Sequence, residues 1–231
     1  MFKPETIKKI FDSASALRSH YKTMPIESIK MCLSSGNAKI GHVLNVSTMP
    51  GMDCGNCSHC IGFCYDIKAC FRYPNTVIDA RIRNSVLLER DRDEFFRRID
   101  DAMNRRRKNK FFRWHVAGDI KDYDYFDRMV KNAVNHSDFV IWTYTKMYNV
   151  VNEWIKNNGA LPSNFHVMFS KWDGVSMPNP YNMPVFVCRL KDGNVDPFDF
   201  NSCYHCPGNC DICKDCGRGC FVGESAWIDE H

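Results

Sequence analysis

Cysteines are concentrated in two short stretches of this chain of 231 residues, which contains thirteen cysteines in all. Five of them lie in GMDCGNCSHCIGFCYDIKAC, residues 51–70, and six lie in CYHCPGNCDICKDCGRGC, residues 203–220. Thiolate sulfur is a preferred ligand of zinc and of iron–sulfur clusters, so cysteines at this density predict metal binding. The candidate metal ligands are Cys54, Cys57, Cys60, Cys64, Cys70, Cys203, Cys206, Cys210, Cys213, Cys216 and Cys220.

Both stretches contain the spacing C-x2-C-x2-C-x3-C, over residues 54–64 and 210–220. Bacterial ferredoxins hold cubane iron–sulfur clusters with this spacing, which favours two [4Fe-4S] clusters here. The ferredoxin run ends in Cys-Pro, whereas Tyr65 and Phe221 follow the last cysteines of these runs. A cluster with four thiolates transfers electrons, whereas three thiolates leave an open iron that can bind a substrate or cofactor.

Zinc is the alternative metal. Structural zinc sites use four thiolate or imidazole ligands, and His59 and His205 lie inside the cysteine runs. The surplus of cysteines favours iron–sulfur clusters over zinc. A compact zinc site in the tail would use Cys203, Cys206, Cys210 and Cys213.

The composition indicates a folded cytoplasmic protein. The apolar fraction of 44% is sufficient for a buried core, and the formal charge of +4 does not by itself require nucleic acid as a partner. The N-terminus lacks an apolar signal region, and no apolar run is long enough to cross a membrane. In a reducing cytosol, dense cysteines more often bind metal than form disulfides. Cys32 and Cys188, outside the two runs, are expected to be small buried apolar residues.

The pattern of elements predicts an α/β fold with parallel strands alternating with helices. Either an open doubly wound sheet or a partial (β/α) barrel fits, and we favour the partial barrel. We expect an α/β domain over residues 1–190, with the cysteine loop 51–70 after the first strand, and a metal-binding tail over residues 191–231 packed on it. Sites in such folds are built where strands end. The expected strands cover residues 40–46, 110–119, 138–146, 164–172 and 184–190, and helical patterns cover 1–30, 76–108, 123–137 and 147–158.

Polar residues at these strand ends are the other site candidates. His115 and Asp119 are interpreted either as polar contacts or a proton relay, or as an interior histidine and a helix cap. Lys146 would pair with a ligand carboxylate or phosphate, or be solvated. The catalytic candidates are His115, Asp119 and Lys146, and the cofactor-binding candidates are Gly118, Asp119, Thr143 and Ser170.

An ordered set of motifs resembles the gene-product-88 family of phages and mobile elements. The set is SSGNAKIG, a cysteine loop closing in C-x3-C-Y, RIRNSVLLERDRDEFFRRI, FRWHVAGDI, IWTYTK and the cysteine-rich tail, over about residues 34 to 231. The family loop has three cysteines ending in CYA, which correspond to Cys54, Cys60 and Cys64, with Asp66 in place of the Ala. The resemblance implies a phage-type protein of the host cytoplasm. Arg81 and Asn84 match the family pattern and are expected near the cluster.

A three-cysteine loop after the first strand is also similar to that of radical S-adenosylmethionine proteins. Their spacing is C-x3-C-x2-C, and here Cys60 and Cys64 fit the first gap while no cysteine follows at the second. This resemblance implies S-adenosylmethionine bound at an open iron, an electron donor as partner, and an auxiliary cluster in the tail. It names no substrate.

Three functions remain open. The first is an iron–sulfur enzyme of the radical S-adenosylmethionine type. The second is a fully ligated redox carrier or sensor, or an accessory protein that binds nucleic acid; the basic run at residues 105–110 is its only support and is better explained as a solvated helix end. The third is a zinc-stabilised interaction module.

Overall fold

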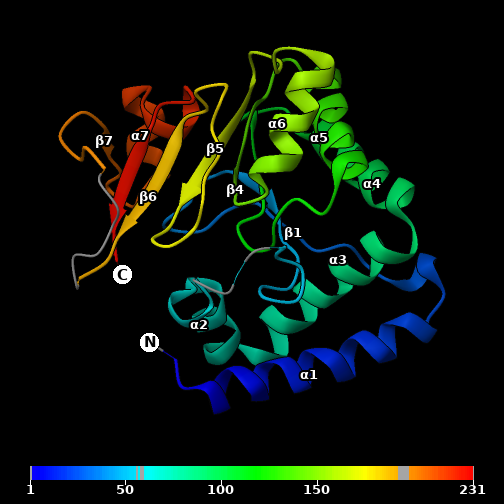
Figure 1. Ribbon diagram of the computed structural model, residues 1–231. Helices are drawn as coiled ribbons and strands as arrows, with labels where there is room; N and C mark the ends of the chain where they lie inside the picture. The colour runs from blue at the N-terminus through cyan, green and yellow to red at the C-terminus, as the bar shows by residue number, and fades with distance from the viewer. Residues whose placement is uncertain (1, 56, 58–59, 192–197, 231) are drawn as a thin grey trace.

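The fold is α/β, as expected, in a computed structural model that describes residues 2–55, 57, 60–191 and 198–230. Eight strands form one sheet that is mostly parallel and does not close into a barrel, with helices packed around it (Figure 1). His59, named above as a candidate zinc ligand, lies outside the described residues. The strands are β1 (Leu33–Ser34), β2 (Leu44–Val46), β3 (Phe111–Trp114), β4 (Val140–Thr145), β5 (Phe165–Lys171), β6 (Val185–Arg189), β7 (Tyr204–His205) and β8 (Ala226–Asp229).

The central strands follow one another in chain order. β2, β3, β4, β5, β6 and β8 are neighbours in that sequence, and every pair among them is parallel. β1 pairs antiparallel with β2 at one edge, and β7 pairs with β8 at the other. Because the central strands are parallel, their carboxyl ends meet at one edge of the sheet, where the first cysteine loop leaves β2.

The expected helices are present, with one division that the pattern did not predict. The stretch from 76 to 108 forms two main helices because Asp91 leaves the helical conformation at φ −151°. Its side chain accepts a hydrogen bond from the Glu94 amide at 2.9 Å and so caps the second of them. The helices are α1 (Pro4–Thr23), α2 (Tyr65–Arg72), α3 (Asp79–Arg90), α4 (Arg92–Arg105), α5 (Tyr123–Asn135), α6 (Tyr148–Asn158) and α7 (Cys210–Cys216), with short turns η1 (Ile26–Ser28), η2 (Ile61–Phe63), η3 (Pro74–Ile78) and η4 (Gly219–Phe221).

The two faces of the sheet are covered by different parts of the chain. Successive side chains of a strand point to opposite faces. Ile141 and Val167 pack with α3 to α6, whereas their neighbours Trp142 and Met168 pack with residues of the C-terminal tail. Figure 1 shows α4, α5 and α6 on one side of the sheet and α7 on the other. We call the second side the tail face.

The tail contains regular structure, although no pattern was evident after Leu190. β8 adds a parallel strand beside β6, with Ala226 and Trp227 buried. The start of α7 is held by the Cys210 amide, which donates to the Lys39 carbonyl at 2.8 Å. The tail is therefore anchored both through the sheet and through the segment that precedes β2.

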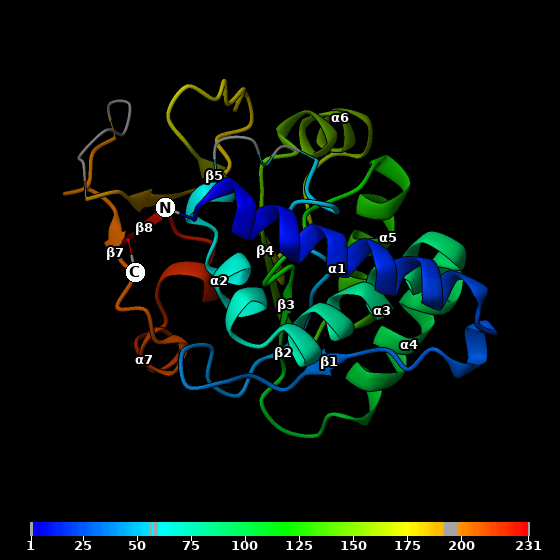
Figure 2. The ribbon, with the colours of Figure 1, turned by 90° about the horizontal axis from the view of Figure 1, so that it is seen from below.

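Helices α1 and α2 lie beyond the carboxyl edge of the sheet. In the view from below, α1 crosses in front of the strands and α2 lies beside it (Figure 2). They pack with α3 around Ile10, Ile67 and Ile82, and Met49 at the end of β2 joins this cluster. In the described part of the chain, no helix is long and apolar enough to cross a membrane.

Two polar side chains of α3 fix the surroundings of the first cysteine loop. Arg81 donates two hydrogen bonds to the buried carboxylate of Asp66, at 3.0 and 3.1 Å. Asn84 accepts from the Cys32 amide and donates to the carbonyls of Cys32 and Ser47, each at 2.8 Å. Both side chains thus bind protein groups. Asp66, which stands where the resembling family has Ala, acts as the partner of Arg81.

Replacing Arg81 by Met is expected to destabilise the protein by about 3 kcal/mol, because the buried Asp66 carboxylate would lose its partner. The double replacement Asp66→Ala with Arg81→Met should recover most of that loss, since neither charge remains. Urea unfolding of the three variants measures both effects. A double variant no more stable than Arg81→Met alone would contradict the pairing.

Candidate functional site

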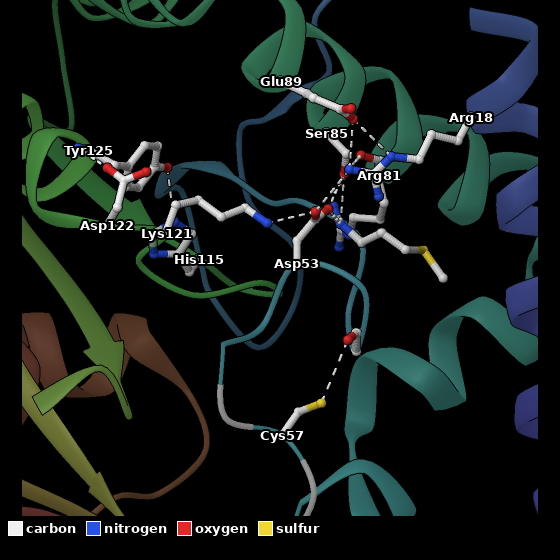
Figure 3. A network of polar contacts seen from close by, with 12 residues as sticks. Arg18, Asp53, Cys57, Arg81, Ser85, Glu89, His115, Lys121, Asp122 and Tyr125 are labelled. Atoms are coloured by element: carbon white, nitrogen blue, oxygen red, sulfur yellow. Dashed lines mark hydrogen bonds and ion pairs between the residues drawn. The ribbon is translucent and has the colours of Figure 1, made fainter. Parts of the chain in front are cut away.

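The first cysteine loop begins at a buried carboxylate. Asp53 is 2% exposed and accepts hydrogen bonds from the Met49 amide at 2.9 Å and from the Ser85 hydroxyl. The ammonium of Lys121 lies 2.7 Å from its Oδ1, and Arg18 is 3.5 Å away (Figure 3). These contacts come from α1, α3 and the segment after β3. Asp53 directly precedes Cys54, so these contacts fix the start of the cysteine loop relative to three parts of the fold.

Four thiols of this loop, Cys54, Cys57, Cys60 and Cys64, form what we call the loop group. Lys146, which directly follows β4, lies near enough to Cys54, Cys57 and Cys60 to interact electrostatically with each of them. The loop also packs closely on Met147, the residue after Lys146. A Cβ added to Gly55 would lie 2.4 Å from the Met147 sulfur. The loop group thus lies against the carboxyl end of β4.

Burial keeps the thiols of Cys54, Cys57 and Cys64 protonated in the absence of a metal. It raises the pKa of Cys54 to about 12 and that of Cys64 to about 11, and it raises the pKa of Cys57. Burial alone would lower the pKa of Lys146, but Asp119 and the ionised forms of the neighbouring thiols outweigh this effect and raise its pKa, so the amine is charged. A metal bound here would displace thiol protons and leave thiolates beside a cation.

Asp119 joins the ends of β3 and β4 beside the loop group. Its carboxylate accepts from the Thr145 hydroxyl at 2.6 Å and from the Lys146 amide at 3.0 Å. Burial raises the pKa of Asp119, while the Lys146 charge acts in the opposite direction. Asp119 also interacts electrostatically with Cys54. The structure therefore brings two of the predicted site residues, Asp119 and Lys146, to the cysteine loop.

His115 is held in the interior. It adopts φ +53°, and its ring nitrogens contact the Thr143 hydroxyl at 3.2 Å and the Tyr125 hydroxyl at 3.0 Å. Burial lowers its pKa to about 3, so the imidazole is neutral at neutral pH. His115 and Thr143 thus contact each other, on the side of the sheet where α5 packs.

The other two predicted ligand contacts lie in different surroundings. Gly118 has φ +92°, and a Cβ there would lie 2.0 Å from the Thr48 hydroxyl, so glycine permits close approach of the β2 and β3 ends. Ser170, at the end of β5, accepts a hydrogen bond from the Trp172 indole at 3.1 Å.

A second set of four thiols, Cys206, Cys210, Cys213 and Cys220, forms the tail group on the tail face. Cys213 and Cys220 are buried in one cluster, and Cys206 and Cys210 pack against that cluster. Cys206, Cys213 and Cys220 lie near enough to influence one another's pKa. Cys210 interacts with Cys213 and Cys220. The hydroxyl of Tyr144 lies 2.5 Å from the Cys220 sulfur, and that of Tyr204 lies 3.6 Å from Cys213. Strand β4 therefore contacts the loop group at its end and the tail group on its face.

The remaining cysteines lie apart from these groups. Cys70 is fully buried among the apolar residues between α1, α2 and α3. Cys203 contacts the Ser202 hydroxyl at 3.8 Å, and Cys216 is exposed. Cys32 and Cys188 are half-buried, which corrects the expectation that both are buried. Among the residues that the structure describes, no three His, Cys, Asp or Glu side chains are arranged to hold a metal ion as they stand.

Comparison with known families identifies the relationship of this chain. The family profile described as Gene product 88 matches residues 27–178, which is more than half of the chain. The chain belongs to the Gene product 88 family. The match includes the loop group and the ends of β3, β4 and β5. It stops short of the tail, so the expected resemblance is confirmed only up to residue 178. Comparisons with curated proteins and with solved structures found no match.

The neutral His115 predicts a specific dependence of stability on pH. Below about pH 6.5 the unfolded imidazole gains a proton that the folded one does not, because its folded pKa is about 3. The free energy of unfolding should therefore fall as the pH falls, by up to about 1.4 kcal/mol per pH unit for this one group.

Replacing His115 by Gln is expected to flatten this fall. Urea unfolding at about pH 7, 6 and 5 measures the slope, where few carboxylates titrate. Replacing the exposed His42 by Gln is the matched control and should leave the slope unchanged. Equal slopes for wild type and His115→Gln would show that His115 is not buried as a neutral group.

Proposed function

We propose that this protein binds two [4Fe-4S] clusters, one at the loop group and one at the tail group, and acts as an enzyme of the radical S-adenosylmethionine type. The observation that carries the proposal is the pairing of each thiol group with a cation. Lys146 lies at the loop group and Arg113, on β3, interacts electrostatically with Cys210 and Cys220 of the tail group. In the described residues neither cation forms a salt bridge with a carboxylate.

Charge balance explains why such an arrangement suits a thiolate-bound cluster. A cluster held by cysteine thiolates brings negative charge into the protein, and nearby charges and hydrogen bonds set its reduction potential. A cation partly shielded from water is costly when its charge is not fully balanced. Lys146 has Asp119 nearby but no salt bridge, and Arg113 has no salt bridge in the described residues, so both costs fall when the cluster is bound. We expect the thiol side chains to turn toward the metal on binding.

The enzyme assignment rests on the place of the loop group. It lies at the carboxyl edge of parallel strands arranged in chain order, which is where α/β proteins build their sites. In the three-cysteine loop of the family, Cys54, Cys60 and Cys64 would hold the cluster and leave one iron open. A reduced cluster of this kind would supply the electron that cleaves S-adenosylmethionine.

The chain's own residues have separate tasks in this proposal. The charged amine of Lys146 would attract the carboxylate of the cofactor. Asp119 holds the backbone of Lys146 in place through the 3.0 Å hydrogen bond to its amide. Asp53 fixes the start of the loop through its contacts with Met49 and Lys121. The strand order suits a sheet curved as a partial barrel, with the tail covering one face.

Metal analysis of anaerobically purified protein tests the proposal. We expect about eight irons and eight sulfides per chain, the content of two cubanes, with a broad visible absorption. Replacing Cys60 by Ala should remove about half of the iron and abolish the effect of S-adenosylmethionine on the electron paramagnetic resonance signal of the reduced protein. Replacing Cys188 by Ala, outside both groups, is the matched control and should change neither.

Other outcomes separate the alternatives. Full iron content without any effect of S-adenosylmethionine would mean a redox carrier or sensor instead of an enzyme. Zinc without sulfide would contradict both iron–sulfur functions and indicate a zinc-stabilised interaction module.

A further inference from the structure

Arg113 is a charged residue in the middle of an apolar strand. It lies on β3 between Phe112 and Trp114, which are fully buried on the helix side of the sheet, so its side chain points to the tail face. Its Nε atom is buried and has no hydrogen-bond partner in the described structure. Arg113 as a whole is half-buried. A guanidinium nitrogen that is shielded from water normally donates to a carboxylate or another anion, so the Nε atom lacks the acceptor that such an atom normally has.

The surroundings of Arg113 contain tyrosines and thiols. Its guanidinium lies 4.8 Å from the centre of the Tyr144 ring, whose hydroxyl contacts the Cys220 sulfur at 2.5 Å. Cys210, Cys220 and Tyr65 lie near enough to interact with its charge when they are ionised. All of these groups are neutral while they carry their protons. The tail thiols would become negatively charged on binding a metal, and they would then supply the counter-charge for Arg113.

We propose that Arg113 is the counter-ion of the tail group, and that Cys206, Cys210, Cys213 and Cys220 together form one anionic tetrathiolate metal site. This inference rests on metal binding by the tail, as proposed above, but not on the identity of the metal. Arg113 acts as a positioning residue, because its charge stabilises the thiolates without binding the metal.

The structure separates the six tail cysteines into four that lie together, the tail group, and two that lie apart. The four thiols of the tail group lie in one cluster: Cys213 and Cys220 are buried with Trp142 and Phe221, and Cys206 and Cys210 pack against them. Cys216 is exposed, and Cys203 contacts Ser202 instead of the other thiols. The ferredoxin-like spacing over residues 210–220 therefore does not define the ligand set, because it includes Cys216 and omits Cys206.

Titration of the reduced, metal-free full chain with Co²⁺ tests this site directly. The test uses a Cys60→Ala background, so that the loop group contributes little. Tetrahedral Co²⁺ bound by four thiolates has characteristic charge-transfer and d–d absorption bands. We expect these bands in this background, and we expect Cys203→Ala and Cys216→Ala to keep them. Cys213→Ala and Cys220→Ala should lose the four-thiolate spectrum.

The role of Arg113 is tested in the same titration. Arg113→Met should weaken Co²⁺ binding by about tenfold or more, equivalent to about 1.4 kcal/mol. Arg113→Lys should restore much of the affinity because it keeps the charge. A merely structural role would not distinguish the two variants in this way. If Arg113→Met fails to fold, Arg113→Gln is compared with Arg113→Lys instead.

Two results would overturn the inference. One is unchanged Co²⁺ affinity in a folded Arg113→Met variant. The other is a four-thiolate spectrum that survives Cys220→Ala but disappears in Cys216→Ala. Because Co²⁺ is the probe, a protein that contains no iron when purified would contradict the iron–sulfur function and still leave this site tested.

Discussion

The parallel pairing of β8 with β6 is the constraint on which the candidate sites depend. It returns the end of the chain to the sheet and places α7 and η4 on the face opposite the main helices. Without it, the tail would be attached to the rest of the fold only through the Cys210–Lys39 hydrogen bond and the packing on the tail face. With it, one sheet carries a thiol group at its carboxyl edge and a second on its tail face. Strand β4 contacts both, through Lys146 and Tyr144.

Charge is arranged around these groups in a consistent way. The buried carboxylates near the loop, Asp53 and Asp66, are each bound by cations, so their charge is compensated within the protein. Lys146 and Arg113 form no salt bridge in the described residues and lie near thiols, Lys146 also near Asp119. Burial favours the protonated thiols of Cys54, Cys64, Cys210 and Cys220 in the free chain, whereas the neighbouring Cys206 side chain lowers the pKa of Cys213 to about 6. Metal binding would convert them to thiolates, and the two cations would then stabilise the loaded form of the protein in preference to the free one.

Much of this arrangement could be predicted from the sequence. The strands at FFRW, VIWTYT and VFVCR follow from their apolar and β-branched residues, and their alternation with helices predicted parallel pairing. Parallel pairing also made Asp119 and Lys146, at two strand ends, candidate site residues, although a helix cap and a solvated strand end were left open as alternatives for them. The role of His115 was left open between two interpretations, since the sequence does not show which groups its nitrogens reach.

Other parts had no local signal. Asp53 depends on Lys121 and Ser85, which are distant in the chain, and β8 depends on a partner strand across a long connection. Cysteine spacing alone groups the tail thiols differently from the site proposed above, because folding packs Cys206 with Cys213 and leaves Cys216 exposed. Arg113 did carry a signal in the sequence, because a charged residue inside an apolar strand needs a partner. We used this strand only to predict which residues lie at its carboxyl end.

A crystal structure of the anaerobically purified protein, with anomalous diffraction collected at the iron edge, tests the central claim most directly. We predict two iron sites per chain: one at the carboxyl edge of β4 beside Lys146, and one on the tail face beside Arg113. The second should be ligated by Cys206, Cys210, Cys213 and Cys220. Thiol groups free of iron, or iron bound away from both cations, would contradict the account.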